Sequence, residues 1–204
     1  MAYVPSGERI SGINWSIERG LVNPSVATMA AQEIVEAIAT GNPMISFDHS
    51  QPKVGYNGYL ITGLEGITAE DTLDAGFSFP SLMVVRKSLE IFKDPALLAE
   101  AAGHYDEAFV NITDAFGKIP LHIDKEPWSL VFISLAGRVK ARIKHIDEPN
   151  YTEEILTPGD AVRIVNPLAK RQRPKHEFTN LSGFPRISYG EYTTQLDSVV
   201  SRSR

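Results

Sequence analysis

The chain has no cysteine among its 204 residues. Disulfide bonds, thiolate metal sites and cysteine nucleophiles are therefore excluded, and the redox compartment stays open. Histidine is scarce as well, with 5 residues, so a transition-metal site has few imidazole ligands to draw on. Any such site must combine these histidines with carboxylates.

Long apolar runs are also missing, since no segment approaches the ~20 residues that a membrane-spanning helix needs. The first residues, MAYVPSGERI, lack the charged and then apolar pattern of a signal peptide. We therefore expect a cytoplasmic protein without a membrane partner. The net charge of -5 gives no overall attraction to nucleic acid, and the length favours one domain over residues 1–204.

Residues 1–105 are expected to form a mixed part, with both helices and strands, that supports the barrel formed by the later residues. After an irregular start, NPSVATMAAQEIVEAIATG has the signature of a helix, with Asn23 as its cap, Pro24 in the first turn and Gly41 as its stop. A short strand is expected in NPMISFDHS, a strand or loop in VGYNGYLITGL, and helices in FPSLMVVRKSLEIFK and DPALLAEAAGHY.

From about residue 106 the pattern changes to short strands separated by turn residues, which is typical of an antiparallel sandwich or barrel. In RVKARIK, basic residues alternate with apolar ones at a period of two, as in a half-buried strand. Residues 193–204 are expected to be a tail. The expected strands are EAFVNIT, IPLHID, SLVFISL, RVKARIK, EEILT, DAVRIVN, KHEFTNL and PRISYGEYTT.

The tripeptide His-Ile-Asp occurs twice, at residues 122–124 and 145–147. A histidine and an aspartate two positions apart on a strand point to the same side and can bind one metal ion. Two imidazoles and one carboxylate on one face of an octahedral ion leave three positions open. His176, in a later strand, is the candidate for the second imidazole.

Arg186 and Ser188 follow His176 on the last predicted strand and point to the same side of it. An arginine binds a carboxylate with two parallel hydrogen bonds, and a serine hydroxyl can add a third. The sequence thus offers a metal site and a carboxylate anchor within one barrel.

In these features the chain resembles the iron(II)- and 2-oxoglutarate-dependent oxygenases, which have a double-stranded β-helix core of the jelly-roll, cupin-like kind. The resemblance covers about residues 106–192. It implies a mainly β protein with flanking helices. The matching residues are, in the order of the family pattern, His122 and Asp124, then His176, then Arg186 and Ser188.

The same resemblance implies that His122, Asp124 and His176 bind Fe(II), and that Arg186 and Ser188 hold the distal carboxylate of the cosubstrate 2-oxoglutarate. The reaction implied is the hydroxylation of a substrate by O2, with release of succinate and CO2. An aspartate at position 124 fits hydroxylases.

Two further residues are weaker candidates for the cosubstrate site. Some members of the family contact 2-oxoglutarate through an asparagine and a hydroxyl residue ahead of the first histidine, and Asn111 and Thr113 stand at such positions. A polar strand residue without a special role is the alternative for each.

Several alternatives stay open. A cupin-type metal enzyme that does not use 2-oxoglutarate, and a non-catalytic barrel that only binds, are the competing functions. The second tripeptide, His145-Ile-Asp147, is interpreted as a solvated strand end because it leads into a polar turn. Small molecules, protein side chains and nucleobases are all open as substrates.

A basic run precedes His176. It is interpreted either as a solvated loop or as a surface beside the active-site mouth that holds an anionic substrate. Its basic residues are Lys170, Arg171, Arg173 and Lys175.

Overall fold

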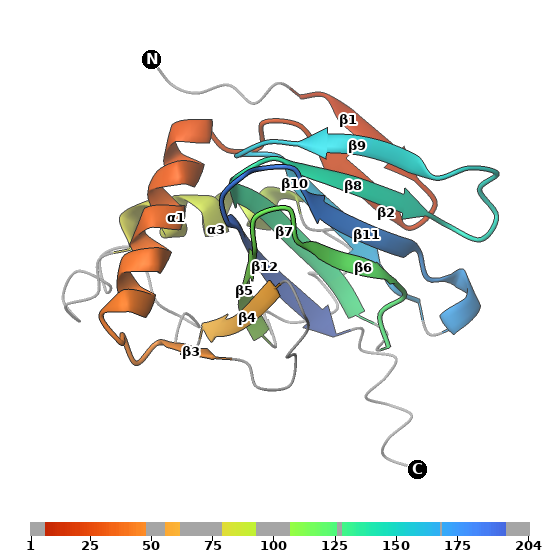
Figure 1. Cartoon of the computed structure of the whole chain (residues 1–204). Helices are drawn as coiled ribbons and strands as arrows, with labels where there is room; N and C mark the ends of the chain where they lie inside the picture. The colour runs from red at the N-terminus through yellow and green to blue at the C-terminus, as the bar shows by residue number, and fades with distance from the viewer. Residues whose placement is uncertain are drawn as a thin grey trace, which may run out of the picture.

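A computed structural model describes residues 7–47, 56–61, 79–92, 107–125, 128–167 and 169–194. Two antiparallel sheets face each other, and two helices cover the outer face of the larger sheet (Figure 1). This is the predicted mainly β architecture with flanking helices and a jelly-roll core. In the described part of the chain, no helix is long and apolar enough to cross a membrane.

The large sheet has eight strands and the small sheet has four. In spatial order, the large sheet contains β1 (Arg9–Gly12), β2 (Trp15–Glu18), β10 (Ala161–Val165), β7 (Trp128–Ala136), β12 (Arg186–Thr194), β5 (Glu107–Thr113), β4 (Tyr56–Ile61) and β3 (Ile45–Phe47). The small sheet contains β6 (Lys118–His122), β11 (Lys175–Asn180), β8 (Val139–Lys144) and β9 (Thr152–Leu156), and η1 (Lys170–Gln172) is a short 3-10 helix before β11.

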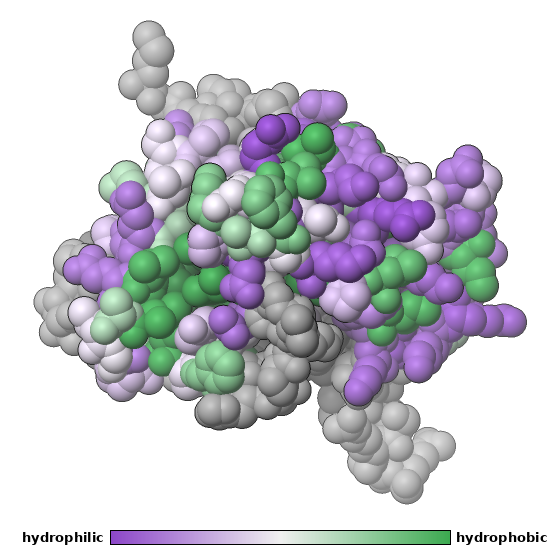
Figure 2. All heavy atoms as spheres, in the orientation of Figure 1, coloured by the Kyte–Doolittle hydropathy of each residue, from purple (hydrophilic) through white to green (hydrophobic). Residues whose placement is uncertain are grey.

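An apolar core fills the space between the two sheets. On β8 the apolar residues are buried in this core, while the basic residues between them are partly exposed on the outer face of the small sheet, so the predicted period of two is confirmed. Figure 2 shows hydrophilic side chains gathered over this outer face, around β8 and β11. The core includes Trp15, Ile17, Phe109, Ile119, Leu130, Phe132, Val139, Ala141, Ile143, Leu156, Val162, Ile164 and Phe178.

A second core lies between the large sheet and the helices α1 (Pro24–Ala39) and α3 (Pro80–Phe92). Helix α1 starts as predicted, because the side chain of Asn23 accepts a hydrogen bond from the N–H of Ser25 and Pro24 stands in the first turn. The Glu33 carboxylate on α1 accepts hydrogen bonds from the N–H groups of Ser81 and Leu82. Because these are orphan donors at the start of α3, Glu33 fixes one helix against the other.

Alternation along the strands decides which core each side chain enters. On β7, Val131, Ile133 and Leu135 pack against the helices, while Leu130 and Phe132 point between the sheets. The same rule applies to β5 and β12, where it sends every second side chain into the barrel interior. Polar residues at such interior positions therefore need a partner inside the barrel.

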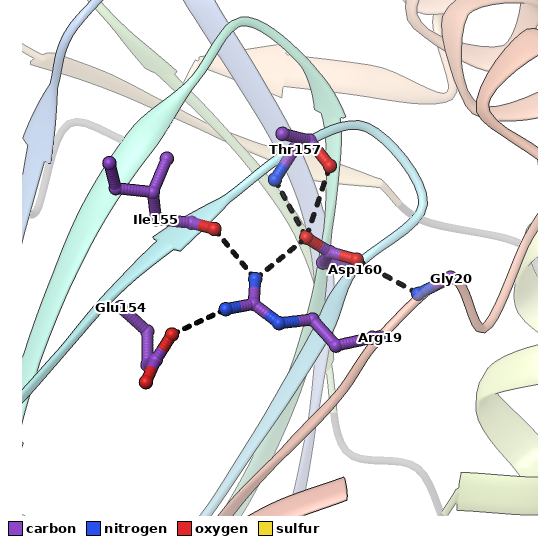
Figure 3. A network of polar contacts seen from close by, with 6 residues as sticks. All are labelled: Arg19, Gly20, Glu154, Ile155, Thr157 and Asp160. Carbon is purple, nitrogen blue, oxygen red and sulfur yellow. Dashed lines mark hydrogen bonds and ion pairs between the residues drawn. The ribbon is translucent and has the colours of Figure 1, made fainter. Parts of the chain in front are cut away.

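A partly buried polar network ties the segment between β2 and α1 to β9 and to the turn that follows β9 (Figure 3). Arg19, which follows β2, pairs with Asp160 at 3.0 Å and with Glu154 at 2.5 Å, and donates to the backbone oxygen of Ile155. The Asp160 carboxylate also accepts hydrogen bonds from Thr157 and from the N–H of Gly20. The turn between β9 and β10 is therefore held from both sheets.

The expected short strand in NPMISFDHS and the helix in FPSLMVVRKSLEIFK are confirmed, and VGYNGYLITGL contains a strand, β4. The prediction of an irregular start is wrong, because β1 and β2 form an antiparallel hairpin in which Gly12 opposes Trp15. The intervening Asn14 has φ 64, a conformation that asparagine tolerates better than most residues. The helix expected in DPALLAEAAGHY lies outside the described residues, as does most of the tail.

Candidate metal centre

Three potential metal ligands converge at one end of the barrel. One ligand atom from each of His122, Asp124 and His176 lies within 4.8 Å of the others. Asp124 Oδ1 is 3.4 Å from Nε2 of His122 and 3.7 Å from Nε2 of His176. The first predicted tripeptide and the distal histidine are thus brought together.

The pairing of β6 with β11 explains why the two histidines meet. His122 and His176 stand directly opposite each other in this antiparallel pair, and their ring centroids are 4.3 Å apart. Asp124 departs from the prediction, because β6 ends at His122 and the aspartate lies two residues beyond the strand. Its position therefore does not follow from the strand alternation.

Each imidazole is oriented by a backbone carbonyl two residues earlier in the chain. Nδ1 of His122 lies 2.7 Å from the oxygen of Pro120, and Nδ1 of His176 lies 3.3 Å from the oxygen of Pro174. Because a carbonyl only accepts, these contacts assign the proton to Nδ1 in both rings. In the neutral form of each ring, Nε2 then carries the lone pair that a metal ligand requires.

Asn166, the first residue after β10, orients the carboxylate. Its Nδ2 donates to Asp124 Oδ2 at 2.8 Å, which leaves Oδ1 facing the two imidazoles. Burial alone would raise the pKa of Asp124, but hydrogen bonding with His122 and attraction to both histidines outweigh it and lower this pKa from 3.8 to about 2. Asp124 is thus an anionic ligand across the physiological range.

His176 is the most deeply buried of the three, with 2% of its surface exposed. Burial lowers its pKa from 6.5 to about 4, against the attraction of Asp124, which raises it. The ring is therefore neutral at pH 7 and does not have to lose a proton before it binds a metal ion.

Arg186 lies inside the same barrel, at the start of β12, with only 1% of its surface exposed. Its Nε and Nη2 are buried, and no described residue accepts a hydrogen bond from either. The carbon of the guanidinium is 5.9 Å from the ring centroids of both Phe132 and Phe178. Burial lowers the pKa of Arg186 from 12.5 to about 10, so the group is still a cation at pH 7.

The other predicted anchor residues surround Arg186. Thr113 stands opposite Arg186 and Asn111 opposite Ser188 in the pairing of β5 with β12. Both β5 residues share the interior face with Phe109, because their neighbours Val110 and Ile112 pack toward the helices.

Ser134 on β7 belongs to the same polar cluster and was missed by the sequence reasoning. It pairs with Ser188 and is 0% exposed. Neither Ser134 Oγ nor Thr113 Oγ1 has a hydrogen-bond partner in the described part of the chain. The signal was a hydroxyl within the mainly apolar strand SLVFISL, at a position that alternation assigns to the interior. The structure thus places four predicted anchor residues and Ser134 on one interior surface.

The second tripeptide does not gather ligands. His145 directly follows β8, and Asp147 is exposed, as expected for a strand end. The expected solvation is wrong for His145, which is only 2% exposed and whose Nδ1 accepts a hydrogen bond from the N–H of Asp147. Among the described residues, no third metal-binding side chain joins this pair.

The basic run divides into two kinds of residue. Lys170, Arg171 and Lys175 are exposed, whereas Arg173 is only 5% exposed. Arg173 donates to the backbone oxygens of Asp124, Lys125 and Pro167. Its predicted part in holding an anionic substrate is therefore wrong, because its donors serve the chain itself.

The cluster fits a divalent transition metal. Two neutral imidazoles and one carboxylate converge, and such a donor set leaves open positions for further ligands. Elsewhere in the same barrel, a buried arginine with hydroxyl neighbours fits a carboxylate. The interior can thus accept a metal ion and an anion together.

Comparison with known proteins supports the fold. No protein-family model matches the chain, and no curated protein matches it by sequence. Among solved structures, a Pseudomonas putida prolyl-4-hydroxylase is similar, with a TM-score of 0.54, 13% identity and coverage of 89% of this chain and 92% of that one. A Drosophila melanogaster CENP-C structure bound to CAL1 has a TM-score of 0.48, 8% identity and coverage of 81% and 96%. An oxalate oxidase has a TM-score of 0.38, 14% identity and coverage of 44% and 42%.

Proposed function

We propose that the protein is an Fe(II)- and 2-oxoglutarate-dependent dioxygenase that hydroxylates a substrate with release of succinate and CO2. His122, Asp124 and His176 would hold the metal. Arg186 and Ser188, with Thr113, Asn111 and Ser134 around them, would hold the distal carboxylate of 2-oxoglutarate. The jelly-roll fold shared with a prolyl-4-hydroxylase is compatible with this chemistry.

One observation carries the proposal: a buried guanidinium, whose Nε and Nη2 have no acceptor among the described residues, lies in the same barrel as the two imidazoles and the carboxylate. Leaving the buried donors of Arg186 without acceptors costs free energy, and no described residue compensates it. A bound carboxylate would accept from these donors in a bidentate pair. A metal enzyme that binds no anion would have no use for this arrangement.

The chain's own groups would act by holding and orienting. Both imidazoles present Nε2 because their Nδ1 atoms are bound to carbonyls, and Asp124 presents Oδ1 because Asn166 holds Oδ2. Fe(II), when bound, supplies the redox chemistry by which O2 oxidises 2-oxoglutarate and places one oxygen atom on the substrate. The rings of Phe132 and Phe178 flank the Arg186 guanidinium and provide a low-dielectric wall, which strengthens its attraction for a carboxylate.

The test separates the three candidate functions. Purified protein is first titrated with 2-oxoglutarate in the presence and absence of Mn(II), a redox-silent substitute for Fe(II), while the thermal midpoint is followed. We expect 2-oxoglutarate to raise the midpoint, and more so with the metal present. Aerobic incubation with Fe(II) and 2-oxoglutarate should then release succinate, and Asp124→Ala should release none.

Each alternative gives a different result. A cupin-type enzyme would bind the metal and gain nothing from 2-oxoglutarate. A non-catalytic module would bind both ligands and release no succinate, whichever candidate substrate is added. Either outcome would overturn the dioxygenase proposal.

A further inference from the structure

Asp124 differs from the two histidines in what holds it. His122 and His176 are members of β6 and β11 and pair with each other across the ladder. Asp124 lies beyond the end of β6, so no strand pairing fixes its backbone. The carboxylate ligand of the proposed metal site therefore depends on contacts from elsewhere in the chain.

Two residues make these contacts. Asn166 donates to the side chain of Asp124, and Arg173 donates from Nη1 to the backbone oxygens of Asp124 and Lys125. Arg173 also donates from Nε to the oxygen of Pro167, the residue after Asn166. Side chain and backbone of the ligand are thus bound to one neighbouring segment.

The position of Arg173 adds a link to the second histidine. Arg173 precedes Pro174, whose backbone oxygen orients the His176 ring. Arg173 therefore connects the chain around Asp124 with the segment after β10 and with the segment that leads into β11. Its guanidinium is suited to this because it presents several donors in one rigid plane.

Burial shows that these contacts are built into the fold. Asn166 is 0% exposed and Arg173 is 5% exposed, although neither belongs to a strand or an apolar core. A buried asparagine and a buried arginine are costly unless their polar groups are used. Here Asn166 Nδ2 and Arg173 Nη1 are used on the one proposed metal ligand that lacks support from a sheet, whereas Asn166 Oδ1 has no partner among the described residues.

We propose that Asn166 and Arg173 form a clamp that positions Asp124 for metal binding, and that they are positioning residues and not metal ligands or substrate-binding residues. The inference rests on the proposed metal site. It reassigns Arg173 from the basic surface to the support of the metal centre. Residues in such supporting shells typically change metal affinity by about 10- to 100-fold when they are replaced.

The test compares Mn(II) affinity, measured by electron paramagnetic resonance, in wild type, Asn166→Ala, Arg173→Met and Arg173→Lys. We expect each variant to lose about 10- to 100-fold in affinity. Arg173→Lys should fail like Arg173→Met, because a compact ammonium group keeps the charge but lacks the separated, planar donors with which Nε and Nη1 reach different backbone oxygens. Arg171→Met, two residues earlier and exposed, is the matched control and should keep wild-type affinity.

A second control separates positioning from general stability. Asn180 is also buried and donates to the backbone oxygens of Asp114 and Phe184, at the opposite end of β11 from His176. Asn180→Ala should lower the thermal midpoint about as much as Asn166→Ala, with Mn(II) affinity of the folded protein unchanged. Hydrogen exchange of the metal-free protein should also rise around residues 123–125 in Asn166→Ala and Arg173→Met, and not in Asn180→Ala.

The outcomes are distinguishable. Wild-type protein that binds neither Mn(II) nor Fe(II) would overturn the metal site and, with it, the proposed function. Wild-type binding with unchanged affinity in folded Asn166→Ala and Arg173→Met would overturn the clamp alone. Equal losses in Asn180→Ala would show that the effect is general destabilisation, and would also overturn the clamp.

Discussion

The candidate metal centre and the Arg186 cluster lie in the same barrel, yet they differ in how many of their hydrogen-bonding groups have partners. At the metal centre, the groups of His122, Asp124 and His176 that face away from one another are bound by the chain. In the Arg186 cluster, donors and hydroxyls are buried without a partner among the described residues. One site is preorganised, and the other is incomplete.

This difference fits the roles proposed for the two sites. A metal ion needs ligands held at fixed orientations, so the chain supplies the supporting contacts in advance. A carboxylate ligand supplies its own acceptors, so its site must keep donors free until it arrives. The incomplete site is therefore expected to carry a stability cost that ligand binding removes.

The largest effect is expected when a ligand of the proposed metal centre is removed. Asp124→Ala should abolish Mn(II) binding within the range measurable by titration, because two imidazoles remain and the one anionic ligand among the described residues is lost. Asp147→Ala is the matched control from the second His-Ile-Asp tripeptide. It should bind Mn(II) like wild type, because Asp147 is exposed and no described third ligand lies near it. The opposite result would reverse the assignment of the two tripeptides.

Replacing Arg186 should have opposite effects on 2-oxoglutarate affinity and on the free energy of unfolding. Arg186→Met should weaken 2-oxoglutarate binding roughly 30- to 5,000-fold, since losing one partner of a buried charge pair costs about 2–5 kcal/mol. The same change should raise the free energy of unfolding of the ligand-free protein by about 1–3 kcal/mol, because unsatisfied buried donors are removed. Isothermal titration and denaturant unfolding measure the two effects. A variant that is less stable than wild type would show that Arg186 has a structural role instead.

Acid should act on the metal centre and spare the Arg186 cluster. His176 has a pKa of about 4 in the folded protein and 6.5 as its ordinary value, so the unfolded chain binds more protons between these limits. The free energy of unfolding of the metal-free protein should therefore fall as the pH falls from 6.5 toward 4. Each unit of pKa difference contributes ~1.4 kcal/mol. Denaturant unfolding in the presence of a chelator measures the slope, which should be smaller in His176→Gln.

Local signals in the sequence were sufficient for much of the fold. The cap at Asn23, the alternation in RVKARIK and the turn residues between strands each predict structure over a few neighbours, and the structure agrees. The hairpin of β1 and β2 was missed because its strands are short and because β2 also pairs with β10, which is far away in the sequence. Tertiary pairing of this kind leaves no local pattern.

The candidate site also contains residues that the sequence predicted and residues that it did not. The spacing of His122, Asp124 and His176 pointed to ligands that the structure brings together. Arg173 was misread because a basic run predicts a solvated surface, and only the folded chain shows which one of its cations meets buried carbonyls. Asn166 gave no signal beyond being a polar residue after an apolar strand. Contacts between distant segments, not composition, assign these residues.

The smallest expected effect concerns Ser134 and tests whether it belongs to the proposed carboxylate site. Ser134→Ala removes one buried hydroxyl that lies beside Ser188 and has no partner among the described residues. If it donates to the bound carboxylate, the affinity for 2-oxoglutarate should fall roughly 2- to 10-fold, the worth of one neutral hydrogen bond. Ser129→Ala is the matched control, because Ser129 is also buried on β7 but points to the opposite face. Equal affinities in both variants would confine the anchor to Arg186, Ser188 and the β5 residues.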